Sequence, residues 1–142
     1  MSREKNLQVV ENVVAAYNAR DWNLVEELHS KSVIGWSPEV PEPRKGRKAI
    51  RKEFVDYALA FPDSRILAER IFGEKDWVFG EFMFSGTHKG PLPGPSGQMI
   101  PATNRPLRLQ YAIAFKLKGG KITERHEYFD LLGMLTQLGL TH

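Results

Sequence analysis

Apolar side chains occupy every second position from Leu107 to Leu117. This period of two places successive side chains on opposite faces of a strand, and it does not fit the 3.6-residue period of a helix. The run ends at Gly119-Gly120, a pair typical of a hairpin turn, and a second strand pattern covers residues 121–129. The sequence therefore predicts an antiparallel hairpin with one apolar face, which must be buried against other elements.

Helical patterns come mainly before this hairpin, and one follows it. We expect helices over about residues 6–19, in a short segment capped by Asp21, after Gly46, and from Asp130 to Gly139. Further strands are expected at residues 31–36, 64–72 and 77–85. Residues 37–44 and 89–106 are proline-rich and predict loops, the second long enough to cover a pocket mouth. This order predicts an α+β fold with helices on one face of a sheet. The last helix is expected to bury Leu131, Leu132, Leu135 and Leu138.

The length of 142 residues suits one domain, residues 1–142, with a core and one small pocket. The absence of cysteine excludes disulfides, thiolate zinc sites and cysteine nucleophiles. No histidines have the spacing of a metal-binding motif, so we expect neither a metal nor another cofactor. We also see no signal-peptide pattern and no apolar run of about 18–20 residues, so the expected location is cytoplasmic, with no membrane partner.

Six of the nine residues from Arg44 to Lys52 are basic, in a chain with a net charge of only +3. A phosphate or nucleic-acid site is one interpretation, because the run precedes a predicted helix N-terminus. We favour a solvated outer face, since most of these side chains lie away from the apolar stripe of Ile50 and Phe54. No nucleic-acid partner is therefore expected.

The strand at 121–129 carries the densest group of ionisable side chains. A two-residue loop at Gly119-Gly120 pairs Ala112 with Glu127 and turns Glu124 and His126 to the apolar face. A loop one residue longer turns Glu127 to that face instead. In both registers an acid faces an apolar surface, where desolvation raises its pKa towards the range of a useful general base. The alternative interpretation is a structural salt bridge, for example with Arg125.

Other candidate residues have structural and functional interpretations of their own. His88 follows an apolar strand and could donate to a ligand or hold the next loop in place. Asp130 is explained as a helix cap, with a catalytic role as the alternative. Tyr17 could present its hydroxyl to a cavity or lie in the core, and Trp36 could form core or pocket wall.

Several short motifs occur together in one order along the chain. They are Gly46 with its helix, Phe61-Pro62-Asp63, Gly86-Thr87-His88-Lys89-Gly90, Pro101-Ala102-Thr103-Asn104-Arg105, Gly120-Lys121-Ile122, and Asp130 leading to Gln137-Leu138-Gly139. From about residue 6 to 140 the chain resembles the SnoaL-like polyketide cyclase family of the nuclear transport factor 2-like superfamily, predicted ester cyclase type. The resemblance implies a cone-shaped α+β fold, a curved antiparallel sheet wrapped by helices around an apolar pocket, and a homodimer paired through the sheet.

Family cyclases close a ring by a cofactor-independent aldol reaction, with an acid–base aspartate three residues before the aspartate that opens the last helix. The corresponding residue here is Glu127, and Ile113 stands near the position of a cyclase histidine. The resemblance thus favours the register that turns Glu127 to the pocket. It implies a lyase or isomerase in which Glu127 removes a proton from a largely apolar carbonyl compound and His88 or Tyr17 donates to the enolate oxygen. The alternative is a non-catalytic protein that binds a small apolar ligand. The expected catalytic residues are Glu127, His88 and Asp130, and the expected substrate contacts are Tyr17, Trp36, Tyr111, Ile113, His126 and Phe129.

Overall fold

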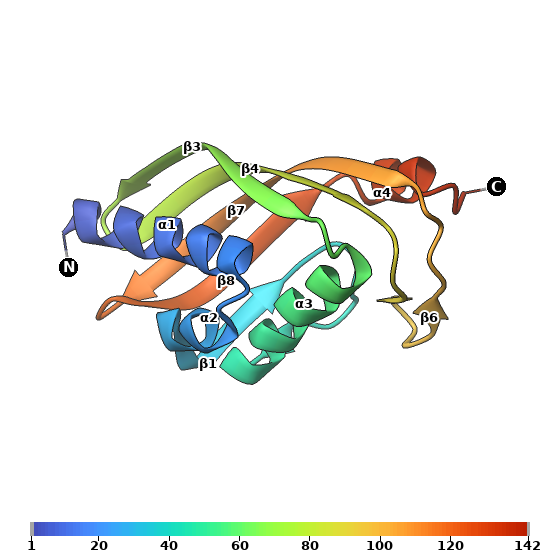
Figure 1. Ribbon diagram of the computed structural model, residues 1–142. Helices are drawn as coiled ribbons and strands as arrows, with labels where there is room; N and C mark the ends of the chain where they lie inside the picture. The colour runs from blue at the N-terminus through green and yellow to red at the C-terminus, as the bar shows by residue number, and fades with distance from the viewer. Residues whose placement is uncertain (1, 142) are drawn as a thin grey trace.

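The structure, a computed structural model, describes residues 2–141. Its main sheet has six strands in the order β2-β1-β8-β7-β4-β3, and it curves around α1, α2 and α3, as Figure 1 shows. The strands are β1 (His29–Trp36), β2 (Arg44–Lys45), β3 (Arg65–Glu74), β4 (Trp77–Thr87), β7 (Pro106–Lys118) and β8 (Lys121–Phe129), and the helices are α1 (Arg3–Ala19), α2 (Trp22–Leu28), α3 (Arg47–Ala60) and α4 (Leu131–Gln137). The predicted α+β class is confirmed. Within residues 2–141, no helix is long and apolar enough to cross a bilayer.

Local capping determines where the helices begin. The side chain of Ser2 accepts a hydrogen bond from the Lys5 amide at the start of α1, and Asp21 accepts one from the Leu24 amide at the start of α2. Gly46 precedes α3 with a φ of 88°, a backbone conformation that favours glycine. These helices pack their apolar stripes on one face of the sheet, and this packing buries the residues of the stripes.

Antiparallel pairing dominates the sheet. Strand β4 pairs with β7 along its whole length, from Trp77 opposite Lys116 to Thr87 opposite Pro106. Strand β1, in contrast, runs parallel to β8 at the other side of the sheet. The face towards the helices carries Val78, Phe82, Phe84, Leu107, Ile113 and Phe115, all buried. This face and the helices form the core.

The proline-rich segment at 89–106 contains more structure than the predicted loop. It forms a small two-stranded sheet of β5 (Leu92–Pro93) and β6 (Met99–Ile100), and Leu92 is buried. The amides of Lys89 and Gly90 both donate to the carbonyl of Ala60, which anchors the segment at the end of α3. The pocket described below has no lining residue from this segment.

Helix α4 differs from its predicted packing at one face. Its buried residues are Met134 and, at its C-cap, Leu138, whereas Leu132 is 67% exposed. The expectation that Leu132 is buried was therefore wrong. Residues 131, 134 and 138 follow the three- and four-residue spacing of one helix face, and position 132 lies off that face.

Candidate functional site

A pocket opens between the helices and the concave face of the sheet. Its empty volume is about 530 Å³, a figure that includes open solvent at the mouth. Most of its lining is aromatic or aliphatic, with a few charged groups. The lining residues are Tyr17, Glu53, Phe54, Tyr57, Ile66, Phe84, Leu107, Leu109, Tyr111, Arg125, Glu127 and Phe129.

The register of the β7–β8 hairpin turns Glu127 towards this pocket. The turn itself has the strict two-residue form, with Lys118 opposite Lys121, which alone would turn Glu127 outwards. The register then shifts between Lys116 and Leu117, so that Thr123 is an extra residue in β8 and Glu127 lies opposite Ile113. The outcome is the pairing expected from a longer loop, but a β-bulge produces it.

Helix α3 brings a second carboxylate to the same place. Glu53 lies on the face of α3 that also carries Ile50, Phe54 and Tyr57, and its side chain is only 8% exposed. Its Oε2 lies 3.2 Å from Nη1 of Arg44. A buried carboxylate needs such a partner, because an unpaired charge in an apolar environment is costly.

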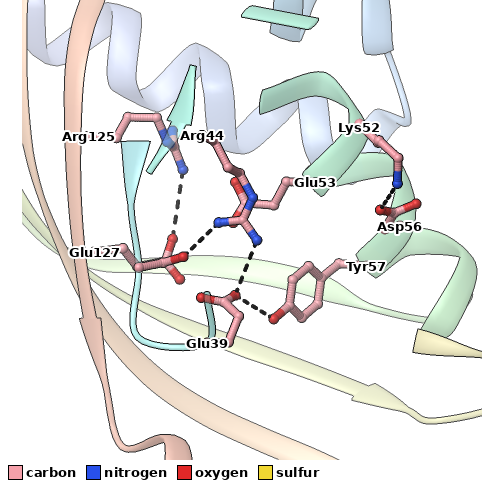
Figure 2. Close-up of polar contacts among 9 residues, drawn as sticks. Glu39, Arg44, Lys52, Glu53, Asp56, Tyr57, Arg125 and Glu127 are labelled. Carbon is pink, nitrogen blue, oxygen red and sulfur yellow. Dashed lines mark hydrogen bonds and ion pairs between the residues drawn. The ribbon is translucent and has the colours of Figure 1, made fainter. Parts of the chain in front are cut away.

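The connection between β1 and β2 supplies the rest of the charged cluster. The hydroxyl of Tyr57 donates to Oε2 of Glu39 at 2.7 Å, and Nη2 of Arg44 lies 3.8 Å from the same oxygen. Arg44 also donates to the hydroxyl of Ser37. Figure 2 shows Arg44 between Glu39 and Glu53, with Glu127 facing them from β8.

Arg125 is the second buried guanidinium of the site. It lies over the rings of Phe54 and Phe115, and its Nη2 is 4.0 Å from Oε1 of Glu127. Its Nη1 is 3.2 Å from Nε2 of His29, whose Nδ1 is 2.6 Å from the carbonyl of Val25. Because that carbonyl can only accept, Nδ1 carries the proton and Nε2 accepts from Arg125. The geometry thus fixes the tautomer of a fully buried histidine.

Burial and neighbouring negative charges both act to raise the pKa of the two pocket carboxyls, Glu53 and Glu127. Desolvation, followed by the charges of Glu53 and Glu39, holds the pKa of Glu127 well above its ordinary value. Desolvation also raises the pKa of Glu53, but the Arg44 guanidinium opposes it. Glu127 is therefore the more readily protonated of the two carboxyls.

The three carboxylates offer oxygens that all lie within 4.8 Å of one another. Oxygen ligands at this spacing can hold a metal ion in other proteins. Here two guanidiniums already neutralise most of their charge, and Arg44 forms an ion pair with Glu53. A cation at this position would have to compete with Arg44, so the donor set fits proton chemistry better than metal binding.

Three of the predicted substrate contacts line the pocket, namely Tyr17, Tyr111 and Phe129. The hydroxyl of Tyr17 lies 2.7 Å from the hydroxyl of Ser64. The hydroxyl of Tyr111 has no hydrogen-bond partner among residues 2–141, and burial holds its pKa well above the ordinary value. Tyr111 is therefore a protonated donor available to a ligand.

Trp36, His126 and Ile113 lie outside the pocket. Trp36 and His126 stack on each other on the outer face of the sheet, with ring centroids 4.4 Å apart. His126 faces outwards because it neighbours Glu127 on β8, and adjacent strand residues point to opposite faces. Ile113 faces inwards but is packed in the core, 3% exposed, below the lining.

His88 and Asp130 also lie away from the pocket lining. His88 is fully buried and stacks on Phe61, and its Nδ1 accepts from the Thr103 amide, which holds the following loop in place. Asp130 caps α4, because its Oδ1 accepts from the Gly133 amide at 2.8 Å. These contacts agree with the structural interpretation of each residue, and neither side chain lines the pocket.

Sequence reasoning missed Glu39, Arg44 and Glu53 as members of the site. Arg44 belongs to the basic run that was interpreted as a solvated face, and its side chain is only 19% exposed because it pairs with two acids. The interpretation holds for Lys48 and Lys52, which pair at the surface. Glu53 could have been found, since it is an acid in register with the apolar stripe of its helix. Glu39 has no comparable local signal.

Comparisons with known proteins agree with this architecture. A family model described as SnoaL-like polyketide cyclase matches residues 7–138. Among solved structures, TsrD from Streptomyces laurentii is 25% identical with a TM-score of 0.84, and the match covers 99% of each chain. AclR from Streptomyces galilaeus is 20% identical with a TM-score of 0.82, over 99% of this chain and all of that one. A protein of ketosteroid isomerase-like fold from Catenulispora acidiphila, solved with trimethylamine, is 19% identical with a TM-score of 0.76, covering 94% of this chain and 93% of that one. A search of curated proteins finds no match.

Proposed function

The chain belongs to the SnoaL-like polyketide cyclase family, and from this premise we propose that it is an enzyme that moves a proton on a small, largely apolar carbonyl compound. The observation that carries the proposal is the Glu127 carboxyl, which faces an aromatic pocket at the position of the family's acid–base residue. Enolisation is the step common to aldol ring closure and to isomerisation, and both need proton transfer at the carbon beside a carbonyl. The proposed chemistry requires only this proton transfer.

Each part of this step has a candidate group in the pocket. Glu127 exchanges a proton with the substrate, since its raised pKa brings it towards working pH. The Tyr111 hydroxyl, or that of Tyr17, donates to the oxygen on which negative charge develops. We do not assign this role to His88, because it is not among the lining residues. The aromatic walls hold the apolar part of the substrate and exclude water, which strengthens these polar contacts.

The test uses α-tetralone, an aromatic ketone, as a probe of enolisation. Exchange of its α-protons in D₂O is followed by proton NMR with the wild type, Glu127→Gln and Glu124→Gln. We expect the wild type to accelerate exchange and Glu127→Gln to lose about 10²–10⁴-fold, the usual contribution of a general acid–base group. Glu124→Gln is the matched control, because Glu124 contacts His126 and Lys116 on the outer face of the same strand. It should keep the wild-type rate.

Two results would overturn the proposal. One is exchange by Glu127→Gln at the wild-type rate, with the fold verified by circular dichroism. The other is saturable binding of α-tetralone, seen by quenching of protein fluorescence, without exchange above the buffer rate. The second result would establish the non-catalytic ligand-binding protein instead.

A further inference from the structure

We propose that Glu53 is a second catalytic carboxylate and that it works as a pair with Glu127, one carboxyl ionised and the other protonated. This inference rests on the proposed function and divides its proton transfer between two residues. Both side chains line the same pocket, from opposite walls, and their carboxylate oxygens lie within 4.8 Å of each other. A carbonyl group held between them could contact both at once.

The ion pairs of the two residues are unequal. Glu53 lies 3.2 Å from Nη1 of Arg44, well within the distance of an ion pair. The nearest guanidinium nitrogen of Glu127 is Nη2 of Arg125, at 4.0 Å, which is the outer limit of an ion pair. The negative charge is therefore better stabilised on Glu53, and a shared proton is better placed on Glu127.

The charge balance of the cluster favours one retained proton. Glu39, Glu53 and Glu127 carry three negative charges when ionised, and Arg44 and Arg125 supply two positive ones. One retained proton makes this half-buried group neutral, which is the arrangement that low-dielectric surroundings favour. Burial raises the pKa of both pocket carboxyls, further for Glu127 than for Glu53, in agreement with that placement.

Glu39 has a different role in the cluster. It does not line the pocket, and its Oε2 is already held by the Tyr57 hydroxyl at 2.7 Å. Its charge acts on Glu127 at short range and so favours the protonated form of that carboxyl. The groups whose charges act on the pair are Glu39, Arg44, Arg125 and Asp56. The titratable hydroxyls of Tyr17, Tyr57 and Tyr111 line the same pocket.

The pair allows a balanced enolisation. The C–H bond beside the carbonyl breaks, its proton passes to the Glu53 carboxylate, and its electron pair forms the carbon–carbon double bond of the enol. The carbonyl π electrons take the Glu127 proton as a new O–H bond. The total number of protons on the pair is unchanged, and only their places are exchanged. Return of a proton to a different carbon gives isomerisation, and attack of the enol on a second carbonyl gives ring closure.

The first experiment measures protonation without any substrate. Carbon-13 NMR of side-chain carboxyls, titrated from pH 4 to 9 in protein with labelled glutamate, is recorded for the wild type, Glu53→Gln and Glu39→Gln. We expect Glu127 and Glu53 to titrate as a coupled pair, and the pKa of Glu127 to fall in Glu53→Gln because a neighbouring charge is lost. Unchanged titration of Glu127 in Glu53→Gln would overturn the pair.

The second experiment measures α-tetralone exchange against pH. The wild type should give a bell-shaped profile, Glu53→Gln should lose at least about 10²-fold together with the acid limb, and the double variant should be no slower than either single one, since the two residues act as a unit. Glu39→Gln, the control within the cluster, should keep the bell shape with displaced limbs. Glu53→Asp keeps the charge and should keep the acid limb at a reduced rate, which separates chemistry from a folding defect.

The failures of the two proposals are distinguishable. Loss of exchange in Glu127→Gln with full exchange and an unchanged profile in Glu53→Gln would refute the pair and leave the proposed function in place. Full exchange in both variants would refute the proposed function as well.

Discussion

At the scale of single residues, Glu127 takes its character from its surroundings more than from its own chemistry. Glu124, three positions earlier on the same strand, lies at the outer face beside Lys116 and His126. Glu127 lies in an apolar pocket beside two further carboxylates, and its pKa is held well above the ordinary value. One strand therefore carries a glutamate at the outer face and a glutamate in the pocket, because adjacent strand residues point to opposite faces.

This raised pKa makes a prediction for stability. A carboxyl whose pKa is higher in the folded than in the unfolded state favours folding at low pH, and that contribution is lost as pH rises through the folded pKa. We therefore expect the unfolding free energy of Glu127→Gln to increase, relative to that of the wild type, as the pH rises from 5 to 8, because glutamine never ionises. Urea unfolding at both pH values measures the gain. Glu124→Gln should show a much smaller change, and an equal change in the two variants would contradict the argument.

His29 predicts a dependence of the opposite sign. Burial, then the Arg125 charge, lowers its pKa to about 3. The unfolded chain binds a proton on this residue near the ordinary pKa of 6.5, so lowering the pH from 7 to 5 should remove about 2 kcal/mol of unfolding free energy through His29 alone. In His29→Gln, whose amide oxygen can still accept from Arg125, the stability lost on acidification should shrink by that amount. The same loss in variant and wild type would show that His29 does not carry it.

The residue pattern and the family resemblance together predicted only part of the site, for a physical reason. Glu127, Tyr17, Tyr111 and Phe129 were all expected in the pocket, and all of them line it. The partners of Glu127 come from chain segments distant in sequence, so no local pattern joins them. Arg44 looked like part of a solvated basic run, and only the fold reveals the two acids that bury it.

At the scale of elements, the β7–β8 hairpin determines the site. Strand pairing alone gave two possible registers, and the choice depends on a bulge at Thr123. A bulge has no strong sequence signal, because it depends on how the bent strand fits its neighbours. The strands themselves were easier to predict: β8 has the expected bounds, and β7 begins one residue earlier than expected. The small sheet of β5 and β6 escaped prediction, since two-residue strands have no periodicity to detect.

The turn of this hairpin gives a prediction for the element. Gly119 and Gly120 have φ angles of 58° and 78°, the positive values that a tight type I′ turn requires. No atom lies within 4 Å of a Cβ built on Gly119, so a substitution there tests backbone conformation alone. We expect Gly119→Val to cost about 1–2 kcal/mol of unfolding free energy and Gly119→Asn only a few tenths. Urea unfolding distinguishes them, and equal costs would argue against the left-handed turn.

At the scale of the whole molecule, the sheet has two unequal faces. Helices α1 to α3 cover the concave face, as Figure 1 shows. The outer face carries exposed apolar side chains from several strands, among them Leu67, Phe72 and Tyr128, which are 64%, 61% and 61% exposed. Exposed apolar side chains of this kind are what a protein–protein interface would bury. The homodimer paired through the sheet, which the family resemblance implies, remains a prediction.

Phe79 and Tyr128 project from β4 and β8 on either side of Ala112 and Ala114 of β7, which makes this stretch of the outer face a good place to disrupt a dimer. We expect the wild type to sediment as a dimer and Phe79→Glu/Tyr128→Glu to sediment as a monomer, because two charges on each copy would be buried without partners. Leu59→Glu is the control, since Leu59 is 65% exposed on α3, in the helix layer, and should leave the dimer intact. The pocket lies on the helix side of the sheet, away from the outer face, so the monomeric variant should still exchange the α-protons of α-tetralone. A monomer that folds but has lost exchange would mean that the second copy supports the site across the sheet, and a wild type that sediments as a monomer would leave the apolar outer face for a different partner.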